Sequence, residues 1–122
     1  MNKTSAKYNL ETRTMKFSED IIIFVSKLSK NNINNPLINQ LIRSATSIGA
    51  NYCEANGASS KKDFKNKIYI CKKEAKETKY WLQLISISNP EHKEQCRKLW
   101  KEAQELTLIF SKIVLTLEGK CK

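Results

Sequence analysis

The residues best suited to binding an anionic partner are basic side chains that recur at helical spacing between positions 61 and 79. This segment holds eight lysines and three acidic residues, so its net charge is +5. Six residues follow one another at alternating intervals of three and four, which places them on one helical face: Lys62, Lys65, Tyr69, Lys72, Lys76 and Lys79. A row of lysines can follow a phosphate backbone, and the tyrosine could stack on a base. The alternative is a solvated helix face with internal ion pairs such as Lys73–Glu77.

A second polar set lies among the apolar residues of an upstream segment. Four of its members are separated by four, four and three positions and therefore share a helical face: Arg43, Ser47, Asn51 and Glu54. Charged side chains beside an apolar seam are costly unless they are paired. We therefore predict a structural polar network in which Glu74 and Glu77 supply the partners of Arg43. The alternative is a small polar pocket that binds a ligand.

The sequence predicts no catalytic residues, no metal site and no cofactor, and we expect a protein that is not an enzyme. The single histidine, His92, lies close to Pro90, and no nucleophile and base can be paired around it. The acidic residues of the polar network could hold a metal only if they resembled a carboxylate bundle site, but the Glu-x-x-His pairs of di-iron bundles are missing. No CxxC pair occurs, and three cysteines are predicted to lie in or near the core: Cys53, Cys71 and Cys96.

The composition indicates one basic helical domain. The 122 residues carry a formal charge of +10, and 40% of them are hydrophobic, which is enough for a packed core. Three glycines and two prolines argue against an all-β fold and against the glycine-rich loops of nucleotide-binding enzymes. Because 19 of the 22 basic residues are lysine, part of the charge could reflect an A/T-rich genome instead of a binding requirement. No signal peptide or membrane span is expected, so we predict a cytoplasmic protein with no membrane partner.

The apolar pattern predicts an all-α fold, an antiparallel up-and-down four-helix bundle. Apolar residues recur at intervals of three and four, which is typical of a bundle seam. The expected elements are a flexible segment over 1–13 and a bundle over 14–119, with helices at about 14–29, 36–56, 60–87 and 90–117. The expected N-caps are Asn35, Ser60 and Asn89, two of which precede a proline, and Gly57 is expected to end a helix in a left-handed conformation.

Apolar residues outside the main seam predict self-association. On the two C-terminal helices they comprise Ile70, Trp81, Leu84, Ile87, Trp100, Thr107, Ile109 and Val114. Exposed apolar surface of this extent usually marks an interface. The alternative is a wider core face on long helices.

The run from Arg43 to Ile85 resembles the signature of a bacterial four-helix-bundle family, the S23 or 23S rRNA intervening-sequence proteins. The residues that carry the resemblance are Arg43, Ser44, Ser47, Ile48, Ala50, Asn51, Glu54, Ala55, Ser60, Asp63, Phe64, Ala75, Glu77, Trp81 and Leu82. Gly57-Ala58 stands where an arginine-rich turn would be expected, which reduces the positive charge there.

The resemblance implies an antiparallel bundle that assembles as a homopentamer, and a role that is poorly defined. It also implies a relation to accessory proteins of diversity-generating retroelements, which are basic pentamers that bind reverse transcriptase and nucleic acid. The residue patterns and the family resemblance together favour a non-enzymatic basic oligomer that binds RNA or DNA through its lysine-rich helix face. The alternative is an interaction scaffold that docks an acidic partner or a polymerase without touching nucleic acid.

Overall fold

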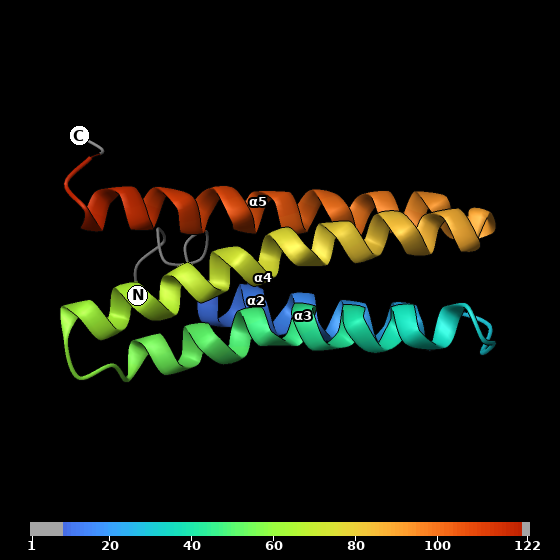
Figure 1. Ribbon diagram of the computed structural model, residues 1–122, viewed down its shortest axis with the longest axis horizontal. Helices are drawn as coiled ribbons and strands as arrows, with labels where there is room; N and C mark the ends of the chain where they lie inside the picture. The colour runs from blue at the N-terminus through green and yellow to red at the C-terminus, as the bar shows by residue number, and fades with distance from the viewer. Residues whose placement is uncertain (1–8, 121–122) are drawn as a thin grey trace.

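The chain forms four long helices that pack side by side with successive helices running in opposite directions (Figure 1). The computed structural model describes residues 9–120. The helices are α2 (Leu10–Val25), α3 (Asn34–Asn56), α4 (Lys61–Ser88) and α5 (Lys93–Leu117), and a short 3₁₀ helix, η1 (Pro90–His92), precedes α5. The described residues contain no strand. The prediction of an all-α, up-and-down four-helix bundle is confirmed.

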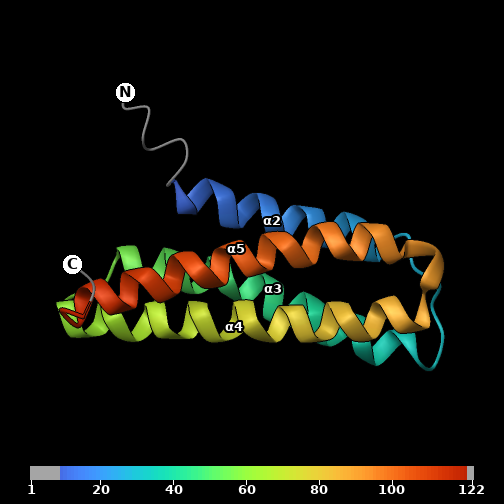
Figure 2. The same ribbon diagram turned by 90° about the horizontal axis from the view of Figure 1, so that it is seen from above.

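The core consists of the inward side chains of all four helices. The largest fully buried ones include Phe17 and Phe24 from α2, and Leu41, Ile68 and Phe110 from α3, α4 and α5. Each lies on the seam whose three-four spacing predicted the helix. The packing is loosest between α2 and α5, and these two helices diverge toward the N-terminus of α2 (Figure 2). An apolar groove of about 510 Å³ lies at that end, lined by Leu10, Tyr52 and residues of α5.

The first helix begins and ends four residues earlier than the sequence predicted. Leu10–Arg13 are helical, so the expected flexible segment over 1–13 is wrong for those residues, and positions 1–8 lie outside the described residues. The cause is an N-cap that the apolar pattern did not reveal: Asn9 Oδ1 accepts a hydrogen bond from the Thr12 amide at 3.1 Å. At the other end, Lys30 Nζ donates to the Val25 carbonyl at 3.4 Å, which satisfies one of the last carbonyls of the helix.

Of the three predicted N-caps, Asn35 is wrong because α3 begins at Asn34, and Asn89 takes the N-cap position of η1 but makes no side-chain cap bond. The N-cap position of α3 is Ile33, and the first helical amide, that of Asn34, donates at 2.7 Å to the side-chain oxygen of Asn31 in the preceding turn. Pro36 lies inside the first turn. Before η1, the Asn89 side chain is turned inward instead of capping. Ser60 does cap α4, since its Oγ accepts from the Asp63 amide at 3.0 Å. Gly57 has a φ of −100°, so it is not left-handed as expected.

The inward turn of Asn89 creates a buried amide pair between the two turns at one end of the bundle. Asn34 Nδ2 donates to Asn89 Oδ1 at 3.0 Å, and Asn89 Nδ2 donates back to Asn34 Oδ1 at 3.0 Å. Both side chains are buried, so each amide satisfies the polar atoms of the other. The pair ties the α2–α3 turn to the α4–α5 turn.

The cysteines divide between core and surface. Cys71 and Cys96 are buried, as predicted, and burial raises their thiol pKa values to about 12 and about 11. Cys53 is exposed, so its predicted place in or near the core is wrong. None of the helices within residues 9–120 is long and apolar enough to cross a bilayer.

Helix α3 approaches α2 closely at Gly49. A Cβ atom built there would lie 3.1 Å from Thr14 Oγ1 and 3.3 Å from Thr14 Cβ. Thr14 is buried and its hydroxyl donates to the Leu10 carbonyl at 2.6 Å, so it cannot move aside without losing that bond. The close approach of α3 to α2 therefore requires a residue without a side chain at position 49.

We expect Gly49→Ala to destabilise the protein by about 1–2 kcal/mol, because overpacking outweighs the gain in helix propensity of roughly 1 kcal/mol. Urea unfolding followed by circular dichroism measures the change. In a Thr14→Ala background the same substitution should cost less, since the 3.1 Å contact with Oγ1 is gone while the 3.3 Å contact with Cβ remains. An additive double-mutant cycle would contradict the packing argument.

Candidate nucleic-acid interface and polar network

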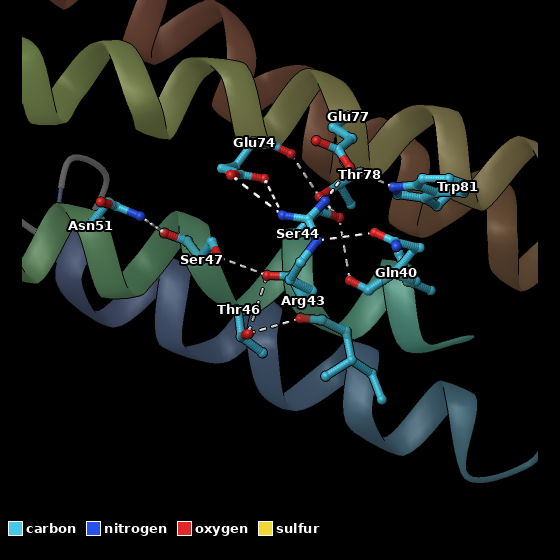
Figure 3. Close-up of polar contacts among 12 residues, drawn as sticks. Gln40, Arg43, Ser44, Thr46, Ser47, Asn51, Glu74, Glu77, Thr78 and Trp81 are labelled. Atoms are coloured by element: carbon cyan, nitrogen blue, oxygen red, sulfur yellow. Dashed lines mark hydrogen bonds and ion pairs between the residues drawn. The ribbon is translucent and has the colours of Figure 1, made fainter. Parts of the chain in front are cut away.

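The polar residues predicted on α3 do not all meet in one network. Arg43 lies against the acidic pair of α4: its Nη1 is 3.2 Å from Glu74 Oε1, and its Nη2 contacts Glu77 Oε2 (Figure 3). Arg43 Nε also donates to Gln40 Oε1 at 3.0 Å. The guanidinium therefore joins α3 to α4 through two carboxylates and bonds to Gln40 of its own helix, a geometry that suits its planar set of donors.

The remaining α3 members make other contacts. Ser47 Oγ donates to the Arg43 carbonyl at 2.7 Å, and Asn51 Nδ2 donates to the Ser47 carbonyl at 2.8 Å, so both bond to their own helix (Figure 3). Glu54 pairs with Lys67 at 2.7 Å, and its side chain is 61% exposed. The prediction that grouped Glu54 with Arg43 is therefore wrong, because the turn that follows α3 brings Lys67 within reach.

Two contacts that the sequence did not predict extend the network. Trp81 Nε1 donates to Glu77 Oε2 at 2.9 Å, which holds the carboxylate that faces Arg43. Beneath the surface, Ser44 Oγ and Thr78 Oγ1 form a buried hydrogen bond of 2.9 Å between α3 and α4 (Figure 3). Only the packing of the two helices could show that these hydroxyls meet.

The lysine-rich face of α4 lies beside α5. Lys62, Tyr69 and Lys76 are exposed, whereas Lys65, Lys72 and Lys79 are partly covered. Lys79 shows which neighbour covers this face: its Nζ contacts Gln104 Oε1 of α5 and lies 5.2 Å from the centre of the Trp100 ring. The face therefore borders the junction of α4 and α5.

Tyr69 is less available for stacking than the sequence suggested. Its hydroxyl donates to Glu118, just beyond α5, and this hydrogen bond raises the pKa of Tyr69 and lowers that of Glu118. The nearby positive charges of Lys120 and Lys65 lower the Glu118 pKa further. A carboxylate thus partly neutralises the N-terminal end of the lysine-rich face.

The opposite end of this face gains positive charge that the sequence did not assign to it. A pocket of about 360 Å³ lies where the C-terminal turns of α4 meet the first turns of α5. Its lining includes Lys93, Arg97 and Lys101, all of which are exposed. Their contribution was missed because the spacing of residues on one helix cannot show which face of another helix lies next to it.

The described residues hold no group of three or more His, Cys, Asp or Glu side chains suited to a metal ion. The chemistry that these side chains offer to a partner is therefore charge attraction, hydrogen bonding and contact with aromatic rings.

Two comparisons with known proteins agree with this architecture. Residues 7–112 match the family model described as 23S rRNA-intervening sequence protein. The chain is also 32% identical to a protein of unknown function from the S23 ribosomal protein family of Bacteroides thetaiotaomicron, whose crystal structure was determined at 1.70 Å resolution. That match covers 85% of this chain and 96% of the other, with a TM-score of 0.74. No curated protein matches the chain.

We expect Arg43→Ala to destabilise the protein by about 1–3 kcal/mol, because it leaves the nearly buried Glu74 carboxylate without its partner. Lys76→Ala, which removes an exposed cation with no salt bridge among the described residues, should change stability by less than about 0.5 kcal/mol. Chemical unfolding of both variants measures the difference. Equal stability of the two would show that the Arg43 contacts do not hold α3 against α4.

Proposed function

The chain belongs to the 23S rRNA-intervening sequence protein family, and from this premise we propose that it is a non-enzymatic basic protein that binds RNA or DNA. The lysine-rich face of α4 makes the contact. The observation that carries the proposal is an unequal distribution of ion pairs around α4. On the side toward α3, Glu74 and Glu77 are paired with Arg43. On the side toward α5, Lys72 and Lys76 form no salt bridge within the described residues.

Uncompensated lysines at intervals of one helical turn suit a polyanion. Each phosphate that a lysine neutralises releases bound counterions, and this release drives binding. Because the face contains lysine and no arginine, it offers point charges and not the forked donors that read base edges. The expected binding is therefore strong at low salt, weak at high salt and tolerant of sequence. A cytoplasmic location, where such polymers are accessible, is part of this proposal.

We also infer that the protein self-associates, a pentamer being the expected assembly from the family resemblance. The apolar residues first predicted for the interface support this only in part, because Thr107 and Val114 are buried and Trp81, Trp100 and Ile109 pack against the core. Ile87 of the predicted set is exposed, and so are apolar side chains outside that set, which support self-association better: Met15, Ile22, Ile23, Ile33, Tyr80, Leu108 and Leu115. Repetition of the lysine-rich face in each subunit would increase avidity for a long polymer.

A different function, docking of an acidic protein or a polymerase, rests on the same exposed apolar residues. Ile33 and Ile87 are 65% and 74% exposed. A protein partner could cover such side chains, whereas a phosphate backbone offers nothing to them.

Titration of a labelled single-stranded RNA and a DNA duplex, followed by fluorescence anisotropy between 50 and 200 mM salt, tests the binding proposal. We expect the Lys72→Ala/Lys76→Ala double variant to bind both polymers more weakly. For the single strand, the slope of log affinity against log salt concentration should become shallower by about 1.4, at roughly 0.7 per lost phosphate contact. The matched control is Lys27→Ala/Lys98→Ala, which removes the same charge from exposed lysines elsewhere. Equal losses in both variants would show that only net charge matters. Absence of binding to either polymer at 50 mM salt would refute the proposal and favour a protein partner.

Light scattering at micromolar concentration tests self-association. We expect a mass several times 14.1 kDa, and a smaller mass when exposed Ile22 and Ile23 are replaced by Gln, because polar side chains do not gain from burial in an interface. A monomer mass for the unaltered protein would contradict the inference.

A further inference from the structure

The pocket at the junction of α4 and α5 differs chemically from the rest of the lysine-rich face. Its volume of about 360 Å³ falls within the range of small-molecule sites. Six of its lining residues are polar, charged or aromatic: Gln83, Ser86, Lys93, Arg97, Trp100 and Lys101. Gln83 and Ser86 continue the spacing of Lys76 and Lys79 along α4, so the pocket lies at the end of the same face.

Three cations from the first turns of α5 line this pocket without acidic partners. Lys93, Arg97 and Lys101 are exposed, and none forms a salt bridge within residues 9–120. Lys79 adds a fourth positive charge, since its Nζ lies 5.2 Å from the centre of the Trp100 ring. Arg97 is the only arginine on the two helices that line the pocket, and its guanidinium can bind a phosphate through two parallel hydrogen bonds.

The pocket also offers groups that a bare anion would not use. The Trp100 indole lines it, and Trp100 Nε1 is the one buried side-chain nitrogen or oxygen among the described residues that has no hydrogen-bond partner. The Gln83 side-chain amide makes no hydrogen bond within the described part of the chain, so both its donor and its acceptor are available. An aromatic ring with a free amide beside it can bind the flat face and the polar edge of a base.

We infer that this pocket binds a single unpaired nucleotide, with its phosphate at Arg97 and its base against Trp100. The inference rests on the proposed binding of nucleic acid, and it adds a preference to it. The lysine-rich face alone would attract any polyanion, whereas the bases of a duplex are stacked and cannot reach an indole. The protein should therefore prefer single-stranded ends, loops or bulges over a continuous duplex.

Adenosine monophosphate tests the pocket independently of polymer binding. In a Trp81→Phe variant, Trp100 is the only tryptophan, and its fluorescence should be quenched as the nucleotide binds. Since Trp81 also donates to Glu77, calorimetric titration of the unaltered protein provides a second measurement that does not depend on that variant. We expect the monophosphate to bind at least about tenfold more tightly than inorganic phosphate or adenosine at the same ionic strength, because each of these lacks one half of the contacts.

Arg97→Gln is the test variant, and Lys98→Ala, one residue further along α5, is its control. Loss of the forked phosphate contact should lower the affinity for the monophosphate by about tenfold. The affinity of the control variant should stay within about twofold of that of the unaltered protein. Equal affinity for the monophosphate and inorganic phosphate would overturn the inference, because the pocket would then recognise charge alone. The same holds if Arg97→Gln has no effect.

The two proposals fail in different ways. If the lysine variants Lys72→Ala/Lys76→Ala weaken polymer binding but adenosine monophosphate does not bind, the pocket inference fails and the proposed function stands. If the monophosphate binds but no RNA or DNA does, the proposed function fails. The inferred preference for single strands then fails with it, because it rests on the binding of nucleic acid. Both are supported if the monophosphate binds, and if Arg97→Gln weakens a single-stranded RNA more than a duplex of the same length.

Discussion

The bridge from Arg43 to Glu74 and Glu77 sets the rotation of α4 about its own axis, and the surface of the protein follows from that rotation. Because both carboxylates lie toward α3, the acidic residues in the middle of α4 are paired there. The lysines on the side toward α5 are left without acidic neighbours on their own helix. The buried hydrogen bond between Ser44 and Thr78, the residues that directly follow Arg43 and Glu77, enforces the same alignment from within the core. Pairing of charge on one side of a helix thus produces an excess of charge on the other.

The fold could be predicted from the sequence because its main determinant is local. The three-four recurrence of Phe17, Ile68 and Phe110 with their neighbours defines helical faces that must be buried, and the short connections leave antiparallel packing as the simple solution. Helix ends were less predictable, since a cap depends on which of several nearby asparagines turns toward the amides. Asn31 was hidden in a run of similar residues, and Asn89 takes the N-cap position of η1 while its side chain forms a tertiary pair.

The candidate site was only partly predictable, for a different reason. The spacing of Lys62 to Lys79 showed that these residues share a face, and the charges of Arg43, Glu74 and Glu77 showed that they needed one another. Spacing along one helix carries no information about the helix beside it. Glu118 at one end of the lysine-rich face, and Arg97 with Trp100 at the other, are distant in sequence and are brought there by the packing of α5 against α4.

The unequal charge of the two helix pairs has a consequence before any contact is made. Residues 61–120 carry a net charge of +6, whereas residues 9–56 carry +1. Since α4 and α5 lie together along one side of the bundle (Figure 1), the charges of the described residues give an electric dipole moment directed across the long axis. A polyanion at a distance would exert a torque on this dipole and turn the α4–α5 side toward itself during approach. Orientation in the field would raise the association rate at low ionic strength more than it raises the lifetime of the complex.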